Sequence, residues 1–206
     1  MLTAAAVTAL MVAANTPSVA RPAGTVADVG GPSTIGGHPA HQGDAVQVGD
    51  GIATASDGAI KLQMVDRSVL MVAPGTSMTV TRYDWTAGAR DVQLTVKQGL
   101  LRLTVPAIAG SSSYTVSTVA GPAAMKSAAA EWFVAVDARS AQVGVLEGSV
   151  TLTSPTTQRS VTIPGHWGTR LEIGLNPVLP RAWSQVEFDG FIRRTQCCQS
   201  PMPKPQ

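Results

Sequence analysis

Short runs in which apolar and polar residues alternate follow one another along most of the chain. The rhythm is clearest over residues 43–80, where a turn signal such as Asp57-Gly58 or Pro74-Gly75 interrupts the alternation, roughly every eight to twelve residues. Successive side chains of a strand point to opposite faces, so this alternation is typical of half-buried strands. It predicts an all-β fold, an antiparallel β-sandwich or a short β-roll or barrel of about ten to thirteen short strands.

Individual strands can be assigned from the same pattern. Residues 60–64 alternate, which places Ile60, Leu62 and Met64 on one face. Residues 92–97 and 101–105 alternate as well, and Gln98-Gly99 between them reads as a turn. We expect the two segments to form a hairpin that buries the apolar residues of both, which are Val92, Leu94, Val96, Leu101, Leu103 and Val105.

Four segments are harder to assign. Residues 24–26 and 34–35 are either short opening strands or part of a linker rich in Gly and Pro. Residues 81–91 are polar and predict an exposed loop. Residues 123–131 have the composition of a helix, but their position among strands favours a short strand or a turn almost as well.

A short helix is expected near the C-terminus. The alternation stops after Asn176-Pro177, and an apolar face can form on a helix that starts after Pro180. The residues near that face are Trp183, Val186, Phe191 and Ile192. The last six residues contain three prolines and predict disorder.

The first 20 residues read as a secretory signal peptide. Residues 2–14 are apolar, Pro17 breaks the run, and Ser18-Val19-Ala20 offers small residues for cleavage. No Lys or Arg precedes the run, so a disordered leader and the remainder of a membrane anchor are the alternatives. The run is shorter than the about 20 apolar residues that span a bilayer. We expect an exported protein, periplasmic or secreted, with no membrane span in the mature chain.

This organisation divides the chain into three parts. Residues 1–20 are the signal peptide, residues 21–175 are the β domain, and residues 176–206 are a partly disordered C-terminal extension. The only two cysteines, Cys197 and Cys198, are adjacent and lie in that extension. They cannot build a disulfide framework, and either a tail without function or an intermolecular disulfide explains them.

The composition narrows the choice of partners and of chemistry. Hydrophobic residues make up 44% of the 206 residues, charged residues only 14%, and the formal charge is +2. So small a charge argues against nucleic acid and against an anionic membrane as partners. His38, His41 and Asp44 have a spacing that zinc ligands use, but Pro39 and the nearby glycines favour three loop residues.

No pattern in the sequence indicates catalysis. The serines lack a Gly-x-Ser-x-Gly context, and spacing alone does not bring two carboxylates together in space. We therefore expect a non-enzymatic protein with no catalytic residue, no cofactor and no metal. Tyr83 and Trp85, in the polar segment, are the candidate partner contacts, because exposed aromatic rings anchor proteins and sugars. We favour the alternative, in which they fold back and cap the core, because tryptophan is usually well buried.

Five short motifs follow one another between residues 24 and 174. They are Gly49-Asp50-Gly51-Ile52-Ala53-Thr54, Asp66-Arg67-Ser68, Ala73-Pro74-Gly75-Thr76-Ser77, Gln98-Gly99-Leu100-Leu101-Arg102-Leu103 and Val145-Leu146-Glu147-Gly148-Ser149-Val150. Their types and order resemble the FecR-type domain, the periplasmic part of ferric-citrate sensor regulators and of related exported proteins. The positions that match the family are Gly49, Asp50, Ile52, Thr54, Asp66, Ser68, Pro74, Ser77, Gly99, Glu147, Gly148 and Val150. We expect them to turn strands, not to catalyse.

The resemblance implies a binding and regulatory module that acts on another protein or on a component of the cell envelope. The sensor regulators also carry a cytoplasmic anti-sigma segment and a membrane helix before this domain, and we expect a stand-alone exported domain here. Two positions depart from the family. Arg67 replaces the glycine of an Asp-Gly-Ser motif, and Ala128-Ala129-Ala130 replaces an Arg-Gly-Thr motif. The alternatives are a structural or adhesive cell-surface component and, less favoured, a secreted hydrolase.

Overall fold

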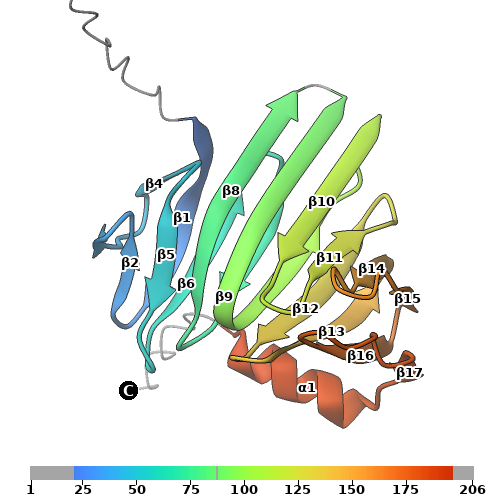
Figure 1. Ribbon diagram of the computed structural model, residues 1–206. Helices are drawn as coiled ribbons and strands as arrows, with labels where there is room; N and C mark the ends of the chain where they lie inside the picture. Colours follow the sequence, from blue (N-terminus) through green and yellow to red (C-terminus); the bar gives the residue numbers. More distant parts are fainter. Residues whose placement is uncertain (1–20, 87, 197–206) are drawn as a thin grey trace, which may run out of the picture.

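The computed structural model describes residues 21–86 and 88–196, which form two β-sheets and one helix (Figure 1). The predicted all-β fold with a short C-terminal helix is confirmed. The described residues contain seventeen strands, more than the predicted number of about ten to thirteen, because strands of two or three residues leave no periodic signal. The predicted signal peptide, Cys197 and Cys198 lie outside the described residues.

The two sheets, which we call sheet A and sheet B, share strand β9 (Figure 1). The order in sheet A is β4 (Ala45–Gln47), β1 (Pro22–Gly30), β6 (Ala59–Met64), β7 (Val69–Val72), β9 (Ala89–Val105), β12 (Ala130–Val136), β13 (Ser140–Glu147), β16 (Trp167–Glu172) and β17 (Arg181–Ala182). The order in sheet B is β3 (His38–Pro39), β2 (Ser33–Ile35), β5 (Gly51–Thr54), β8 (Ser77–Thr86), β9, β10 (Ser111–Ser117), β11 (Pro122–Met125), β14 (Ser149–Thr153) and β15 (Ser160–Pro164). Strands β9 and β10 run parallel, whereas the other pairs in these two orders are antiparallel.

Strand β9 runs through both sheets. Its first half pairs with β8 and β10 in sheet B, and its second half pairs with β7 and β12 in sheet A. The predicted hairpin of residues 92–97 and 101–105 is therefore wrong, because these segments are two halves of one strand. The chain bends at Gly99 (φ 98°), where a Cβ atom would lie 2.4 Å from the Cα of Thr76. Only glycine allows that approach and that φ.

The inner faces of the two sheets enclose one hydrophobic core. Ile60, Leu62 and Met64 line it from sheet A, as predicted. The predicted apolar residues of both halves of β9 are also buried, namely Val92, Leu94, Val96, Leu101, Leu103 and Val105. Full burial of such a side chain contributes roughly 1.5–3 kcal/mol. The alternation therefore identified the buried face correctly even where the predicted topology was wrong.

The ambiguous segments are mostly strands. Residues 24–26 and 34–35 belong to β1 and β2, and residues 123–131 contain most of β11 and the start of β12. The predicted loop over residues 81–91 is wrong, because this segment forms the β8–β9 hairpin. Tyr83 and Arg90 of the hairpin are buried. The segment is polar because its outer face is exposed and because its inner face contributes a charged side chain to a buried ion pair.

Helix α1 (Gln185–Arg194) packs on the outer face of sheet A (Figure 1). Phe188 is its buried residue, and Phe191 and Ile192 pack beside it. The predicted apolar face was partly wrong, because Trp183 precedes the helix and Val186 is 75% exposed. No helix in residues 21–86 and 88–196 is long and apolar enough to cross a membrane.

Two glycines on neighbouring strands make room for Trp183. Gly144 of β13 pairs with Gly168 of β16. A Cβ atom would lie 2.3 Å from the indole at Gly144 and 2.0 Å from it at Gly168. The Trp183 ring therefore packs directly on the backbone of both strands, and its other contacts include the stacked ring of Phe191, at a centroid distance of 5.3 Å.

A capping box fixes the start of the helix. The Ser184 side chain accepts a hydrogen bond from the backbone N–H of Glu187, and the Glu187 carboxylate accepts one from the backbone N–H of Ser184. The hydrogen bonds that Arg181 and Ser184 donate to the carboxylate lower the pKa of Glu187 to about 2. The cap therefore keeps its charge in mildly acidic solution.

Candidate functional site

A buried ion pair lies where the β8–β9 hairpin meets the turn between β6 and β7. The Asp66 carboxylate, in that turn, accepts a hydrogen bond of 2.9 Å from Nη1 of Arg90, the second residue of β9. Both side chains are 0% exposed. Burying two charges is costly unless the remaining polar atoms of both are also hydrogen-bonded.

The Asp66 carboxylate is fully satisfied. It accepts hydrogen bonds from the backbone N–H of Ser68 (2.9 Å), from the Ser68 hydroxyl (2.7 Å) and from the Tyr83 hydroxyl, in addition to the bond from Arg90. Asp66 and Ser68 belong to a turn of sheet A, whereas Tyr83 belongs to sheet B. The cluster therefore ties the two sheets together at this end of the sandwich.

The Arg90 guanidinium is held from several sides. Its Nε and Nη2 donate to the Ser112 hydroxyl at 3.1 and 2.8 Å, and Nη2 also donates to the carbonyl of Pro106 at 3.1 Å. The guanidinium carbon lies 5.7 Å from the centroid of the Tyr114 ring. Arg90 thus anchors the start of β10 and the loop that leads to it.

Tyr83 and Tyr114 flank the ion pair but differ in their bonding. Burial raises the pKa of both hydroxyls above the usual tyrosine range, so both remain protonated at neutral pH. The Tyr83 hydroxyl donates to Asp66. The Tyr114 hydroxyl is buried and has no partner in hydrogen-bonding geometry among the described residues.

Removing the two hydroxyls is expected to have opposite consequences. Tyr83→Phe should lower the free energy of unfolding by about 1–3 kcal/mol, because a buried charged acceptor loses its donor. Tyr114→Phe should leave stability unchanged or raise it, because the Tyr114 hydroxyl lies near the hydroxyls of Tyr83 and Ser68 but makes no hydrogen bond of good geometry with the described residues. Urea unfolding followed by circular dichroism measures both, and equal losses would contradict the assignment.

A cleft opens beside this cluster, between the β6–β7 turn and the tip of the β8–β9 hairpin. We call it the Trp85 cleft. It has a volume of about 320 Å³ and is lined by Asp66, Arg67, Trp85, Gly88 and residues 106–109. A second hollow, of about 400 Å³, is also lined by Trp85, together with Pro22 and Val65 among others. Trp85 therefore lines two hollows.

The structure separates the two aromatic residues that the sequence singled out. Tyr83 is 4% exposed and supports the cluster from inside, whereas Trp85 is 37% exposed. Their side chains lie on the same face of the hairpin, because the two residues are two positions apart along β8. A partner contact at this position therefore rests on Trp85, with Tyr83 as its buried support.

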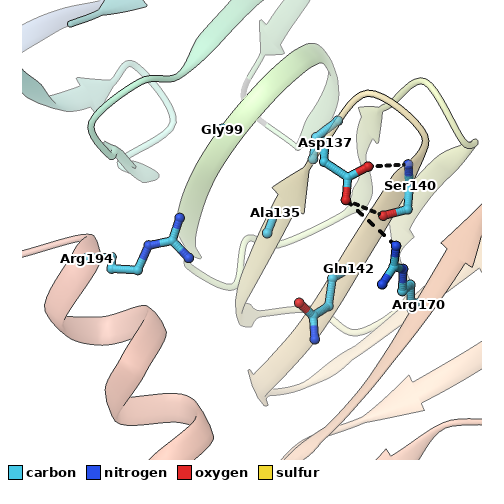
Figure 2. Close-up of a pocket in the computed structure, with 8 residues that line it drawn as sticks. Gly99, Ala135, Asp137, Ser140, Gln142, Arg170 and Arg194 are labelled. Atoms are coloured by element: carbon cyan, nitrogen blue, oxygen red, sulfur yellow. Dashed lines mark hydrogen bonds and ion pairs between the residues drawn. The ribbon is translucent and has the colours of Figure 1, made fainter. Parts of the chain in front are cut away.

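Figure 2 shows another hollow, of about 200 Å³, on the outer face of sheet A beside the end of α1. Asp137 accepts hydrogen bonds of 2.7 Å from both the backbone N–H and the hydroxyl of Ser140, and these bonds lower its pKa. Nη2 of Arg170 lies 3.8 Å from the same carboxylate. Asp137 and Arg170 in this hollow are therefore paired with neighbouring groups of the protein itself. This makes the Trp85 cleft the stronger candidate for a binding site.

The groups in the Trp85 cleft suit recognition better than catalysis. Its ionisable side chains are Asp66, whose oxygens are occupied, and Arg67. Within residues 21–86 and 88–196, no group of three His, Cys, Asp or Glu side chains is placed to hold a metal ion. Among the residues of the spaced triplet, His41 Nδ1 lies 3.5 Å from the Asp44 carboxylate at the surface. Aromatic, apolar and arginine side chains together are typical of protein interfaces.

Comparison with known families matches residues 50–151 to the FecR protein family. The chain contains a FecR domain. Two crystal structures, each of a candidate anti-sigma factor from Parabacteroides distasonis, have a similar fold, with TM-scores of 0.54 and 0.55 and sequence identities of 17% and 16%. The similarity covers 69% of this chain and 64% or 63% of those chains, so the chain spans less than two thirds of their length. No curated protein sequence matches the chain.

The FecR motifs meet in space around the bend of β9. Thr54, from the first motif, donates to the carbonyl of Ala73 at 2.7 Å and accepts from the backbone N–H of Thr76 at 2.9 Å. The hydroxyl of Thr76 accepts from the N–H of Leu100 at 3.0 Å, next to Gly99. Three FecR motifs that are distant in sequence therefore form one hydrogen-bonded unit.

The other FecR motif residues lie in turns or in the core. Gly49 has φ 98° in the β4–β5 turn, where the Asp50 carboxylate accepts from the N–H of Gln47 at 2.7 Å. Gly148 has φ 82° between β13 and β14, where a Cβ atom would lie 2.4 Å from the carbonyl of Ala129. Of the remaining positions, Ile52 and Val150 are buried, Glu147 is exposed, Pro74 lies in the β7–β8 connection, and Ser77 is the first residue of β8.

Arg67, where the resemblance to the FecR domain implies a glycine, has a backbone conformation that glycine favours. Its φ is 68°, in the left-handed region, and its N–H donates to the carbonyl of Met64 at 3.0 Å. A side chain in this region costs about 1–2 kcal/mol relative to the right-handed one. The turn thus places an exposed arginine side chain at the edge of the Trp85 cleft.

Proposed function

We propose that this protein is an exported, periplasmic or secreted, non-enzymatic regulatory module that binds another protein through the face around Trp85. FecR membership and the fold that it shares with candidate anti-sigma factors support a role in signal transduction. The apolar run and the small residues that precede residue 21 support export. Signal transduction by a module without catalytic groups requires a protein partner.

The observation that carries the proposal is that Trp85 is partly exposed on a hairpin that buried hydrogen bonds hold rigid. The ring is 37% exposed at the end of a hairpin, and the hairpin is fixed by the buried bonds that Tyr83 and Arg90 make with Asp66. A rigid, partly exposed tryptophan loses little conformational freedom on binding, which is why such residues dominate the energy of many interfaces. A tryptophan that only capped the core would be buried, whereas Trp85 is partly exposed and lines two hollows.

Photo-crosslinking in the native host tests the binding face. A photoreactive phenylalanine at Thr86, next to Trp85 and exposed, is expected to give one reproducible protein adduct, which mass spectrometry then identifies. The matched control places it at Thr156, an exposed residue of the β14–β15 turn. The added substitution Trp85→Ala should abolish the adduct at Thr86. Adducts that form equally at both positions, or that survive Trp85→Ala, would refute the proposal.

Export has a separate test. Mass spectrometry of the protein purified from the native host is expected to show a mature chain that starts near residue 21 and is recovered outside the cytoplasm. Recovery of the chain with residues 1–20 intact in the cytoplasm would contradict export but would leave the binding face to the crosslinking result.

A further inference from the structure

We infer that the Trp85 cleft binds an extended segment of the partner protein in which a carboxylate side chain lies next to an apolar one, and that Arg67 selects the carboxylate. This inference rests on the proposed function and specifies the partner of the same face. It follows from the shape of the cleft, from its charge and from the position of Arg67.

The shape of the cleft suits an apolar side chain. Pro106 and Ile108 line the cleft together with Trp85, and their loop is held in place because the Pro106 carbonyl accepts a hydrogen bond from buried Arg90. The cleft is therefore preformed, which reduces the entropic cost of binding. Its volume of about 320 Å³ lies at the lower end of ligand sites.

The surface continues past Trp85, and this continuity favours an extended chain over a compact molecule. The second hollow that Trp85 lines includes Pro22 and Val65, and Val65 is 42% exposed. One apolar side chain fills only one of the two hollows. A peptide in extended conformation can place side chains in both and cross the Trp85 ring between them.

The charge of the cleft is positive. The negative charge of Asp66 is compensated by Arg90 inside the protein. The Arg67 side chain makes no hydrogen bond, ion pair or ring contact with the described residues. An exposed guanidinium without a partner, beside apolar surface, is complementary to a carboxylate, which it binds through two parallel hydrogen bonds.

The backbone of Arg67 strengthens the assignment. A glycine would adopt its φ of 68° without strain, yet the turn carries an arginine. Gln158 and His166 have the same backbone conformation but do not line the cleft, so strain alone assigns no role. The strained residue at the cleft is also the one that supplies its unpaired charge, as strained residues at binding sites often do.

Peptide titrations of the isotope-labelled full chain test the inference. The probes are acetyl-Leu-Asp-Leu-amide and its Asn and Lys counterparts, and the readout is the NMR signal of the Trp85 indole N–H, assigned by its loss in Trp85→Phe. We expect the signal to shift on titration, with binding of the Asp peptide at least about ten-fold tighter than that of the Lys peptide.

Two variants separate the role of Arg67 from folding. Arg67→Gly should raise the melting temperature, because it relieves the backbone, and should reduce the preference among the three peptides to within about two-fold. Arg139→Ala, an exposed arginine outside the cleft, should leave the preference unchanged. Absence of any shift at Trp85, equal binding of the Asp and Lys peptides, or a preference that survives Arg67→Gly would overturn the inference. Such a result with the crosslink at Thr86 retained refutes only the partner chemistry, whereas loss of that crosslink refutes the binding face itself.

Discussion

Arg90→Met is expected to lower the free energy of unfolding by about 3–5 kcal/mol, because it leaves the Asp66 carboxylate buried without its counter-charge. The substitution also removes the donors to Ser112 and to the Pro106 carbonyl, so the loop beside the Trp85 cleft should loosen. Chemical denaturation followed by circular dichroism measures the first effect. Faster hydrogen exchange over residues 106–112 measures the second.

Two further variants make this result specific. Arg82→Met removes an arginine of β8 whose ion pair with Asp91 is half exposed, and it should destabilise the fold far less than Arg90→Met, because solvent screens the exposed pair. The double variant Asp66→Asn with Arg90→Met should recover part of the loss, because the unpaired charge is then absent. An Arg90→Met protein that is as stable as Arg82→Met would show that the buried pair is not important for the fold.

Gly168→Ala is expected to displace Trp183 and to release helix α1 from sheet A. The new Cβ would lie 2.0 Å from the indole, a separation that real atoms do not adopt, so the ring must leave its place on the two strands. Overpacking and the loss of a buried tryptophan predict a decrease of about 3 kcal/mol in the free energy of unfolding. Limited proteolysis should then cleave the chain after β16 much earlier than in the wild type.

Gly190→Ala is the matched control for this prediction. Gly190 lies within α1, and a Cβ there would meet nothing within 4 Å. Alanine at an open helical position should stabilise the protein by up to about 1 kcal/mol. A Gly168→Ala protein with unchanged stability and unchanged proteolysis would mean that Trp183 does not hold the helix on the sheet.

The fold class was predictable from the sequence because alternation is a local signal. It identified the inward residues of β6 and of both halves of β9, and the types and order of the turn motifs identified the FecR domain. The direction of the chain after a glycine is not a local property. Gln98-Gly99 reads as a hairpin turn, but Gly99 only bends β9, because the backbone of Thr76 packs against it and the strand continues into the other sheet.

The candidate site was predictable only in part. Trp85 was identified by its type and its polar surroundings, but Arg90 was assigned to an exposed loop. Its side chain occupies an inward position two residues before Val92, and an arginine in the register of buried valines is a signal for a buried partner. The partner, Asp66, lies 24 residues away in the chain, and no local pattern connects the two.

The packing site of Trp183 on Gly144 and Gly168 could not be predicted from the sequence either. No pattern in the sequence singles out Gly144 or Gly168, and only the pairing of β13 with β16 brings them together. The helix prediction failed at Val186 for a related reason. Its apolar face is chosen by contact with Phe133, through Phe188 and Phe191, and not by periodicity along the helix alone.

The passage of β9 through both sheets has a consequence for the synthesis of the chain. Its partners β7 and β8 are made before it, whereas β10 and β12 are made after it, and sheet B is not complete before residue 164 nor sheet A before residue 182. The nascent chain is therefore expected to remain largely without stable structure until late in translation. A chain that folds late and all at once remains unfolded during synthesis, and only an unfolded chain can pass through a narrow export channel.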